Sequence, residues 1–93
     1  MGLVIERREG ESVLVGRQIK VTLVAVRDQR IVLDVERTDG SVRFRRTLAD
    51  ADEVLNLGPV RIQARRPRQV PTAKLTFAAP RHVAIARSEL LAR

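Results

Sequence analysis

Hydrophobic and polar residues alternate along most of the chain, and a period of two is typical of β-strands. The alternation is clearest over 19–26, where Ile19, Val21 and Leu23 share one face. Other short apolar or alternating segments end at turn residues such as Asp39-Gly40, and they also predict strands. These segments are 3–5, 13–15, 31–36, 42–46, 60–64, 74–78 and 82–86. The chain is therefore predicted to be mainly β, with an antiparallel meander of four strands in residues 1–36.

Two segments depart from this period. Residues 48–57 predict a helix, with Thr47 as its N-cap, acidic residues in its first turns and Gly58-Pro59 at its end. The acidic residues are Asp50, Asp52 and Glu53. Residues 78–93 are expected to hold the last strand and a short C-terminal helix. We therefore predict one domain over residues 1–93, in which the helix lies between the strands of 42–46 and 60–64.

Composition narrows the possible chemistry. The chain has 93 residues, no cysteine and one histidine, His82. This excludes disulfides and thiolate metal sites, and it argues against Ser-His-Asp chemistry or a histidine-based metal centre. No glycine loop for phosphate and no nucleophile–base set is found, so we expect neither an enzyme nor a cofactor. The segment Met1–Gly10 lacks the apolar core of a signal peptide, and no apolar run is long enough for a membrane span.

Charge gives the first positive indication of function. Lysine and arginine number 18 against 11 acidic residues, for a net charge of +7, and all the basic residues except Lys20 and Lys74 are arginines. The guanidinium group presents a planar fork of donors that suits phosphates and base edges. Residues 38–93 carry most of the excess, with eleven basic and five acidic residues. A nucleic-acid partner is therefore predicted.

Both ends of the chain resemble the carbon storage regulator (CsrA/RsmA) family. The N-terminal match is an aliphatic triplet and an arginine pair in residues 3–8, then Gly10-Glu11 and a second aliphatic strand over 13–15. The strands over 19–26 and 31–35 look like the third and fourth strands of the family. The C-terminal match is Ala-Pro, a basic residue, a valine-rich strand and an arginine within residues 79–90.

This resemblance implies a CsrA-like small β-barrel or sandwich that binds messenger or small regulatory RNA in the cytoplasm. Such a protein would recognise GGA-type single-stranded loops and control translation, acting as a translational repressor. The family builds its site where the first strand of one subunit meets the fifth strand of the other. Carried over to this chain, the RNA-binding residues are Ile5, Glu6, Arg7, Arg8, Val83, Ile85 and Arg87. Arg87 is expected to contribute most.

The chain also departs from the family. Glu6 stands where the family usually has threonine, and a negative charge beside RNA should weaken or alter binding. Residues 37–77 are absent from ordinary members, although one subgroup carries an inserted helix. If residues 41–78 repeat the strands of 12–35, one chain could fold as a pseudo-dimer with a single RNA site. A conventional homodimer with an insertion is the alternative.

Other basic residues leave both a functional and a structural interpretation open. Arg65, Arg66 and Arg68 form a basic loop that could add phosphate contacts or could be ordinary solvated surface. The same holds for the arginines of residues 43–46. A different class of function is a protein-binding β-module without specific RNA recognition, because an edge strand can pair with a partner's strand.

Overall fold

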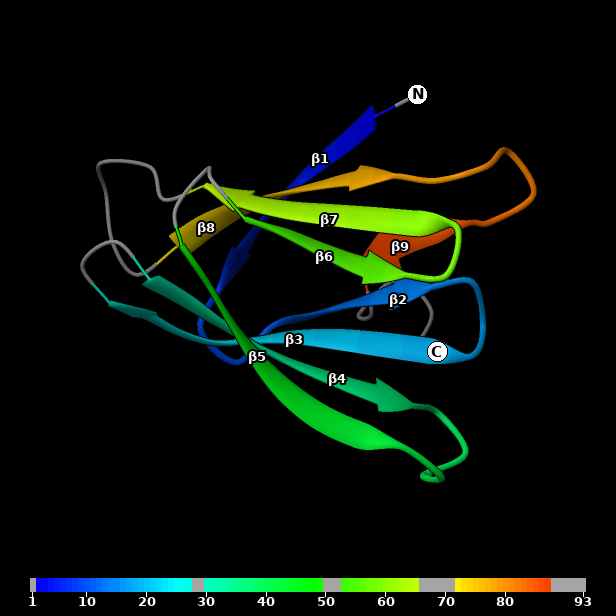
Figure 1. The fold of residues 1–93 in the computed structure, drawn as a ribbon, viewed down its shortest axis with the longest axis horizontal. Helices are drawn as coiled ribbons and strands as arrows, with labels where there is room; N and C mark the ends of the chain where they lie inside the picture. Colours follow the sequence, from blue (N-terminus) through cyan, green and yellow to red (C-terminus); the bar gives the residue numbers. More distant parts are fainter. Residues whose placement is uncertain (1, 28–29, 50–52, 66–71, 88–93) are drawn as a thin grey trace.

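The computed structural model describes residues 2–27, 30–49, 53–65 and 72–87, which form strands and turns (Figure 1). The described strands are β1 (Gly2–Arg8), β2 (Ser12–Val15), β3 (Ile19–Arg27), β4 (Arg30–Arg37), β5 (Arg43–Ala49), β6 (Val54–Leu57), β7 (Val60–Arg65), β8 (Thr72–Ala78) and β9 (Ile85–Arg87). The prediction of a mainly β chain is confirmed. Within the described residues no helix is long and apolar enough to cross a membrane.

The strands form two antiparallel sheets. One sheet has the order β1-β8-β7-β6, and the other has the order β5-β4-β3-β2-β9. Hydrogen-bonded neighbours run antiparallel throughout. The described strands do not close into a barrel, since the two sheets share no strand and each keeps two edges. Of the two architectures expected from the sequence, the structure therefore has the sandwich.

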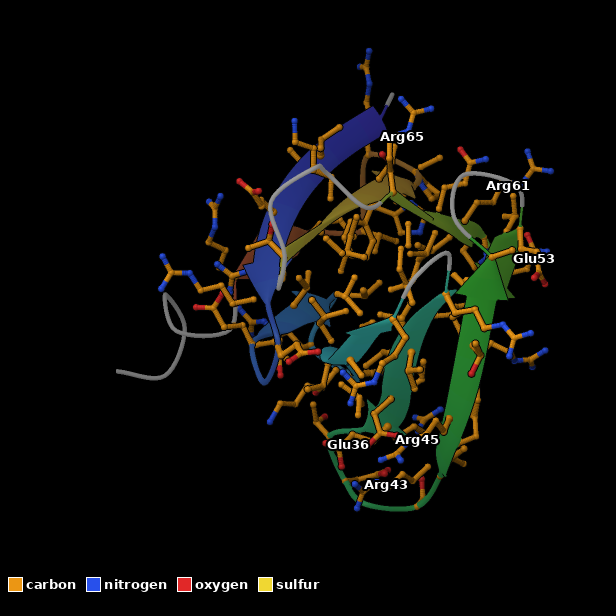
Figure 2. The ribbon with its side chains drawn as sticks, turned by 90° about the vertical axis from the view of Figure 1, so that its left-hand side faces the viewer. Glu36, Arg43, Arg45, Glu53, Arg61 and Arg65 are labelled. Atoms are coloured by element: carbon orange, nitrogen blue, oxygen red, sulfur yellow. The ribbon has the colours of Figure 1, made fainter. Side chains whose placement is uncertain are left out.

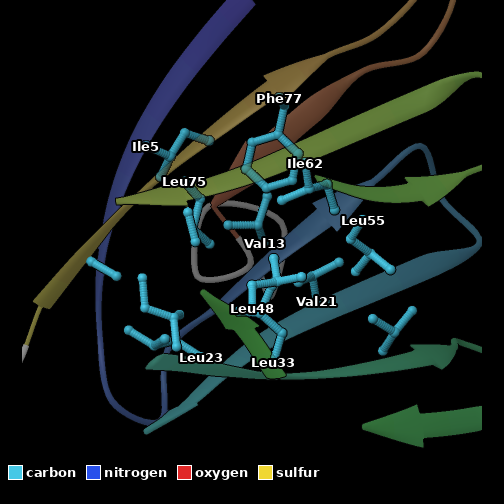
Figure 3. Packing of buried hydrophobic residues seen from close by; sticks show 14 of the residues in the cluster. Ile5, Val13, Val21, Leu23, Leu33, Leu48, Leu55, Ile62, Leu75 and Phe77 are labelled. Atoms are coloured by element: carbon cyan, nitrogen blue, oxygen red, sulfur yellow. The ribbon is translucent and has the colours of Figure 1, made fainter. Parts of the chain in front are cut away.

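The core lies between the two sheets and consists mainly of aliphatic side chains (Figure 3). Successive side chains of a strand point to opposite faces, so the alternating pattern of the sequence supplies one apolar face per strand. Leu23 and Leu33 come from the five-stranded sheet, whereas Ile62, Leu75 and Phe77 come from the four-stranded sheet, and all five are fully buried. One chain thus supplies both halves of its core.

The predicted helix over 48–57 is wrong. Its first residues belong to β5, which pairs with β4, and its last four form β6, which pairs with β7. Leu48 and Leu55 are both buried in the core, one from each sheet. The Glu53 side chain accepts a hydrogen bond from the Ala49 backbone N–H at 3.0 Å, so it joins the residue before β6 to the end of β5. Asp50 and Asp52 lie outside the described residues.

The physical reason is that a ten-residue helix is marginal on its own. Pairing on two different sheets offers residues 48–49 and 54–57 backbone hydrogen bonds and buries leucines in both halves of the core. Tertiary contacts therefore override the local helix signal.

The end of the chain differs from its prediction in length. The strand expected over 82–86 is observed as Ile85–Arg87, because a turn precedes it in which the Val83 N–H donates to the Pro80 carbonyl at 3.0 Å. The predicted C-terminal helix falls on residues 88–93, which lie outside the described residues.

The order of strands reveals an internal repeat. The strands β2, β3 and β4 are consecutive neighbours in one sheet, and β6, β7 and β8 are consecutive neighbours in the other. β1 precedes the first set of three strands and pairs with β8, the last strand of the second set. β5 precedes the second set and pairs with β4, the last strand of the first set, so β5 is the counterpart of β1. A repeat of residues 12–35 over residues 41–78 would make the strand of 42–46 correspond to β2, but in the structure that strand is β5, the counterpart of β1. Each half thus contributes its leading strand to the sheet of the other half.

Candidate nucleic-acid interface

Two edges of the sandwich lie together, and they come from opposite ends of the chain. β1 is the outermost strand of the four-stranded sheet, and β9 is the outermost strand of the five-stranded sheet. Leu3 of β1 and Phe77 of β8 line one shallow pocket together with Pro80, Val83 and Ile85. The structure therefore brings the N-terminal and C-terminal segments singled out in the sequence to one place.

The four predicted residues of β1 divide between two faces. Ile5 and Arg7 are buried, with 4% and 5% of their surface exposed, whereas Glu6 and Arg8 are exposed. The Ile5 side chain packs in the core beside Leu75, its partner on β8. Ile5 can therefore contribute only its main chain to a surface contact, while Glu6 and Arg8 can contribute side chains.

The buried Arg7 guanidinium joins β1 to the start of β2. Its Nε donates to the Glu6 carbonyl at 3.0 Å, and Nη1 donates to the Ser12 carbonyl at 3.2 Å. The Glu11 carboxylate lies 3.9 Å from Nε. Arg7 therefore holds the corner of the molecule between the two sheets. The sequence did not reveal this, because an Arg-Arg pair gives no indication of which member points inward.

The turn after β1 is bonded to β3, so it fixes the end of β1 against the five-stranded sheet. Glu9 accepts a hydrogen bond from the Val26 N–H, and Glu11 accepts one from the Arg8 N–H, both at 2.8 Å. Main-chain bonds join Gly10 and Glu11 to Leu23, next to the irregularity at which the β3–β4 register shifts. Both carboxylates are thus engaged in the turn, so they hold the arginines of β1 in place.

The C-terminal residues complete the candidate surface. β9 pairs with β2 so that Arg87 lies opposite Val13, one residue beyond the Ser12 carbonyl that Arg7 binds. Arg87 is exposed, whereas Val83 and Ile85 are half-buried and pack against the core. Arg7 and Arg87 are thus related to neighbouring residues at the start of β2, and of the two only Arg87 is exposed.

Glu6 is held on the outer face of the four-stranded sheet. Its carboxylate accepts a hydrogen bond from the Thr72 hydroxyl at 3.1 Å. In the register, Glu6 lies opposite Lys74, which in turn lies opposite Arg65. Glu6, Lys74 and Arg65 thus form a row across three neighbouring strands. The two positive charges reduce the negative electrostatic potential that Glu6 creates at the β1 edge.

Arg65 is the one predicted auxiliary residue within the described ranges. It ends β7 and is exposed (Figure 2). Arg66 and Arg68 lie outside the described residues. Arg65 therefore belongs to the outer face of the four-stranded sheet, two strands away from β1.

The arginines of β5 have structural partners at the opposite edge of the five-stranded sheet. Arg43 and Arg45 donate to the two carboxylate oxygens of Asp34 at 2.9 and 3.0 Å. The hydrogen bonds from Arg45 and then Arg43 lower the pKa of Asp34. The guanidinium carbon of Arg46 lies 5.7 Å from the centre of the Phe44 ring, within cation–π range. Figure 2 shows Arg43 and Arg45 far from Arg65.

His82 lies exposed in the turn before β9. Within the described residues, no group of three or more histidine or acidic side chains is placed to hold a metal ion.

The chain was compared with models of protein families, with curated proteins and with solved structures, and none of them matches it.

Proposed function

We propose that this chain binds single-stranded RNA along the β1–β9 edge and acts as a post-transcriptional regulator of translation. The observation that supports the proposal most directly is the junction of the first and last strands, where Leu3 of β1 shares a pocket with half-buried Val83 and Ile85. The carbon storage regulators that the chain ends resemble use the same pair of strands. The partners would be messenger RNA or small regulatory RNA, met in the cytoplasm, and no cofactor is needed.

The chemistry of this edge suits an unpaired loop. Proteins read single-stranded RNA through base edges and through stacking on side chains, whereas phosphates are bound by cations. Among the described strands, β1 and β9 each have one edge that pairs with no other strand, and Arg8, Arg81 and Arg87 are exposed cations on these strands or in the turn before β9. The Leu3, Val83 and Ile85 side chains provide an apolar surface between them. Bases of a GGA-type loop would contact the main chain and the apolar surface, while the arginines hold its phosphates.

The internal repeat implies one RNA site in each chain. The equivalent edge of the second half combines β5 with β6, but among the described residues no strand has the place that β9 has beside β2. In addition, Arg43 and Arg45 of β5 are already engaged by Asp34. We therefore propose that RNA binds with a stoichiometry of one hairpin to one chain.

Replacing Arg87 with alanine tests the site. An arginine that contacts bases or phosphates contributes about 1–3 kcal/mol to binding, so Arg87→Ala should weaken the affinity by that amount. Fluorescence anisotropy with a labelled hairpin that carries GGA in its loop, and with a scrambled-loop hairpin, measures the change. Arg61→Ala is the matched control, because Arg61 is also exposed and lies on β7, away from this edge.

The two variants carry the same net charge, so a general effect of charge would weaken both equally. Equal losses, or an unchanged affinity for Arg87→Ala, would contradict the proposed site. Phosphate contacts also require affinity to fall steeply as salt rises. Binding that tolerates salt and does not distinguish the two loops would instead favour a protein-binding β-module without RNA recognition.

A further inference from the structure

The hairpins β2–β3 and β6–β7 correspond to each other, although three residues separate β2 from β3 and two separate β6 from β7. Each begins with a four-residue strand and turns at a glycine with positive φ, which is 63° at Gly16 and 61° at Gly58. The turns lie at the same end of the sandwich and line one pocket together (Figure 1). β6 is therefore the structural counterpart of β2, and Asn56 corresponds to Leu14.

The two counterparts differ in what lies on their outer edge. β2 pairs with β9, whereas β6 is an edge strand among the described residues. The Gly16 N–H donates to the Ala84 carbonyl at 2.6 Å, so the N–H two residues earlier, at Leu14, points the same way. By this equivalence, the N–H groups of Asn56 and Gly58 point away from β7 towards the open edge. β6 thus presents backbone donors to an incoming strand.

An apolar groove lies beside this edge. It has a volume of about 370 Å³ and lies between the β3–β4–β5 side of one sheet and the β6–β7 turn of the other. Its apolar lining consists of Ile19, Val35, Val42, Phe44, Leu57 and Pro59. Val42 keeps 49% of its surface exposed. The groove therefore exposes side chains that a further apolar segment would cover.

The other half of the molecule shows what such a segment looks like. There, Val83 lies beside Val15 and Gly16, the counterparts of Leu57 and Gly58, and Ile85 pairs with Val15. Val83 and Ile85 also meet Leu3 and Phe77, which correspond in register to Phe44 and Val35. The pattern that fits is an extended strand with two aliphatic residues separated by a small one.

We propose that the β6 edge and this groove bind an extended segment of another protein by β-strand addition. The segment would run antiparallel to β6. It would place two aliphatic side chains in the groove, from residues that have one small residue between them. A second copy of this chain is not the expected partner, because each copy brings one such strand and uses it on its own β2. β6 and β1 are the two outermost described strands of one sheet, and binding at β6 does not depend on RNA binding at β1.

A peptide with the sequence of residues 79–87 is the probe, since this segment pairs with the equivalent strand β2. The full chain should bind the labelled peptide with 1:1 stoichiometry in fluorescence anisotropy. A peptide in which the residues equivalent to Val83 and Ile85 are aspartate should not bind. In amide NMR spectra of the full chain, signals of Leu55, Asn56 and Leu57 should shift, while those of Val13 and Val15 should stay.

Asn56→Pro is the decisive variant of the protein. Proline removes the N–H directed at the open edge and is tolerated on edge strands, so the β6–β7 ladder should survive. We expect it to weaken peptide binding at least tenfold, whereas Asn56→Ala, which keeps the N–H, should bind normally. Val42→Asp places a charge in the groove from an exposed position and should weaken binding by a similar factor. Circular dichroism checks that each variant is folded.

Three results would overturn the proposal. They are an absence of peptide binding to the full chain, equal binding by Asn56→Pro and Asn56→Ala, and shifts at Val13 and Val15 that place the peptide on β2. Arg87→Ala, the variant that tests the RNA edge, should leave peptide affinity unchanged, so the two proposals fail independently.

Discussion

Asp34 joins β4 to β5 through two arginines. Its side chain is only 13% exposed, while Arg43 and Arg45 reach it from solvent. Side-chain hydrogen bonds from these arginines lower the pKa of Asp34 below its ordinary value of 3.8. A carboxyl group whose pKa is lower in the folded state stabilises the fold above its unfolded pKa, and this contribution is lost as pH falls through the folded pKa.

This linkage predicts a pH-dependent difference between the wild type and Asp34→Asn. The wild type should be the more stable near neutral pH, and its advantage should shrink as pH falls below about 3.8, the ordinary pKa. Urea unfolding at a series of pH values measures both free energies. A difference that stays constant from neutral to strongly acidic pH would show that the ion pairs contribute nothing to stability.

Arg7 shows how a local pattern can mislead about a single residue. Arg7 and Arg8 are adjacent, so the strand turns one inward and the other outward. The inward guanidinium is retained because the Glu6 and Ser12 carbonyls and the Glu11 carboxylate surround it. These partners come from a tight turn whose geometry depends on bonds to β3. The family resemblance puts Arg7 among the proposed RNA-binding residues, but the sequence could not reveal that its side chain is buried at the corner and does not face solvent.

At the scale of elements, the two glycine turns support the internal repeat. A Cβ atom at Gly16 or Gly58 would meet nothing within 4 Å, so substitution is limited by the positive φ and not by space. Alanine at either position should cost about 1–2 kcal/mol, the penalty of a left-handed conformation. Because the two φ values differ by so little, we expect nearly equal losses in the free energy of unfolding.

Gly2→Ala is the control for this prediction. Gly2 has no positive φ, and its added Cβ would meet Thr76 and Phe77 atoms at ordinary contact distances of 3.8 and 3.9 Å. Thermal or urea unfolding should therefore show a small change. Markedly unequal losses for Gly16→Ala and Gly58→Ala would contradict the equivalence of the two hairpins.

Most strands could be predicted from the sequence because their signal is local. The alternation over 19–26 and the turn at Asp39-Gly40 are decided by residues that are close in the chain, and both agree with the structure. The failure at 48–57 has a different cause, since Leu48 and Leu55 fit a helical face as well as two strands. Pairing with β4 and β7 decided between these alternatives, and such pairing has no local signature.

At the scale of the whole molecule, one chain provides both sheets and the core between them. The radius of gyration is 12.2 Å, which agrees with the value of about 12 Å for a compact chain of this length. The chain therefore does not need a second copy to complete its core. We predict a monomer, in which the repeated halves replace the two subunits of a dimer.

Size-exclusion chromatography with light scattering measures this directly. The expected mass is 10.5 kDa, independent of loading concentration. A mass near twice that value would show that the chain forms a homodimer, and it would contradict the predicted monomer. Addition of the GGA-loop hairpin should shift the peak to the mass of one chain with one RNA.

The sequence alone determined the β character, most strand positions, the basic surface and the two terminal segments of interest, because each depends on residue type and short-range spacing. Only the tertiary structure decided which strands are neighbours. β1 pairs with β8 and β9 pairs with β2, across long stretches of chain. Such pairings are selected by the joint burial of side chains from distant segments. They bring the first and last described strands together and leave β6 at an edge of the described sheet.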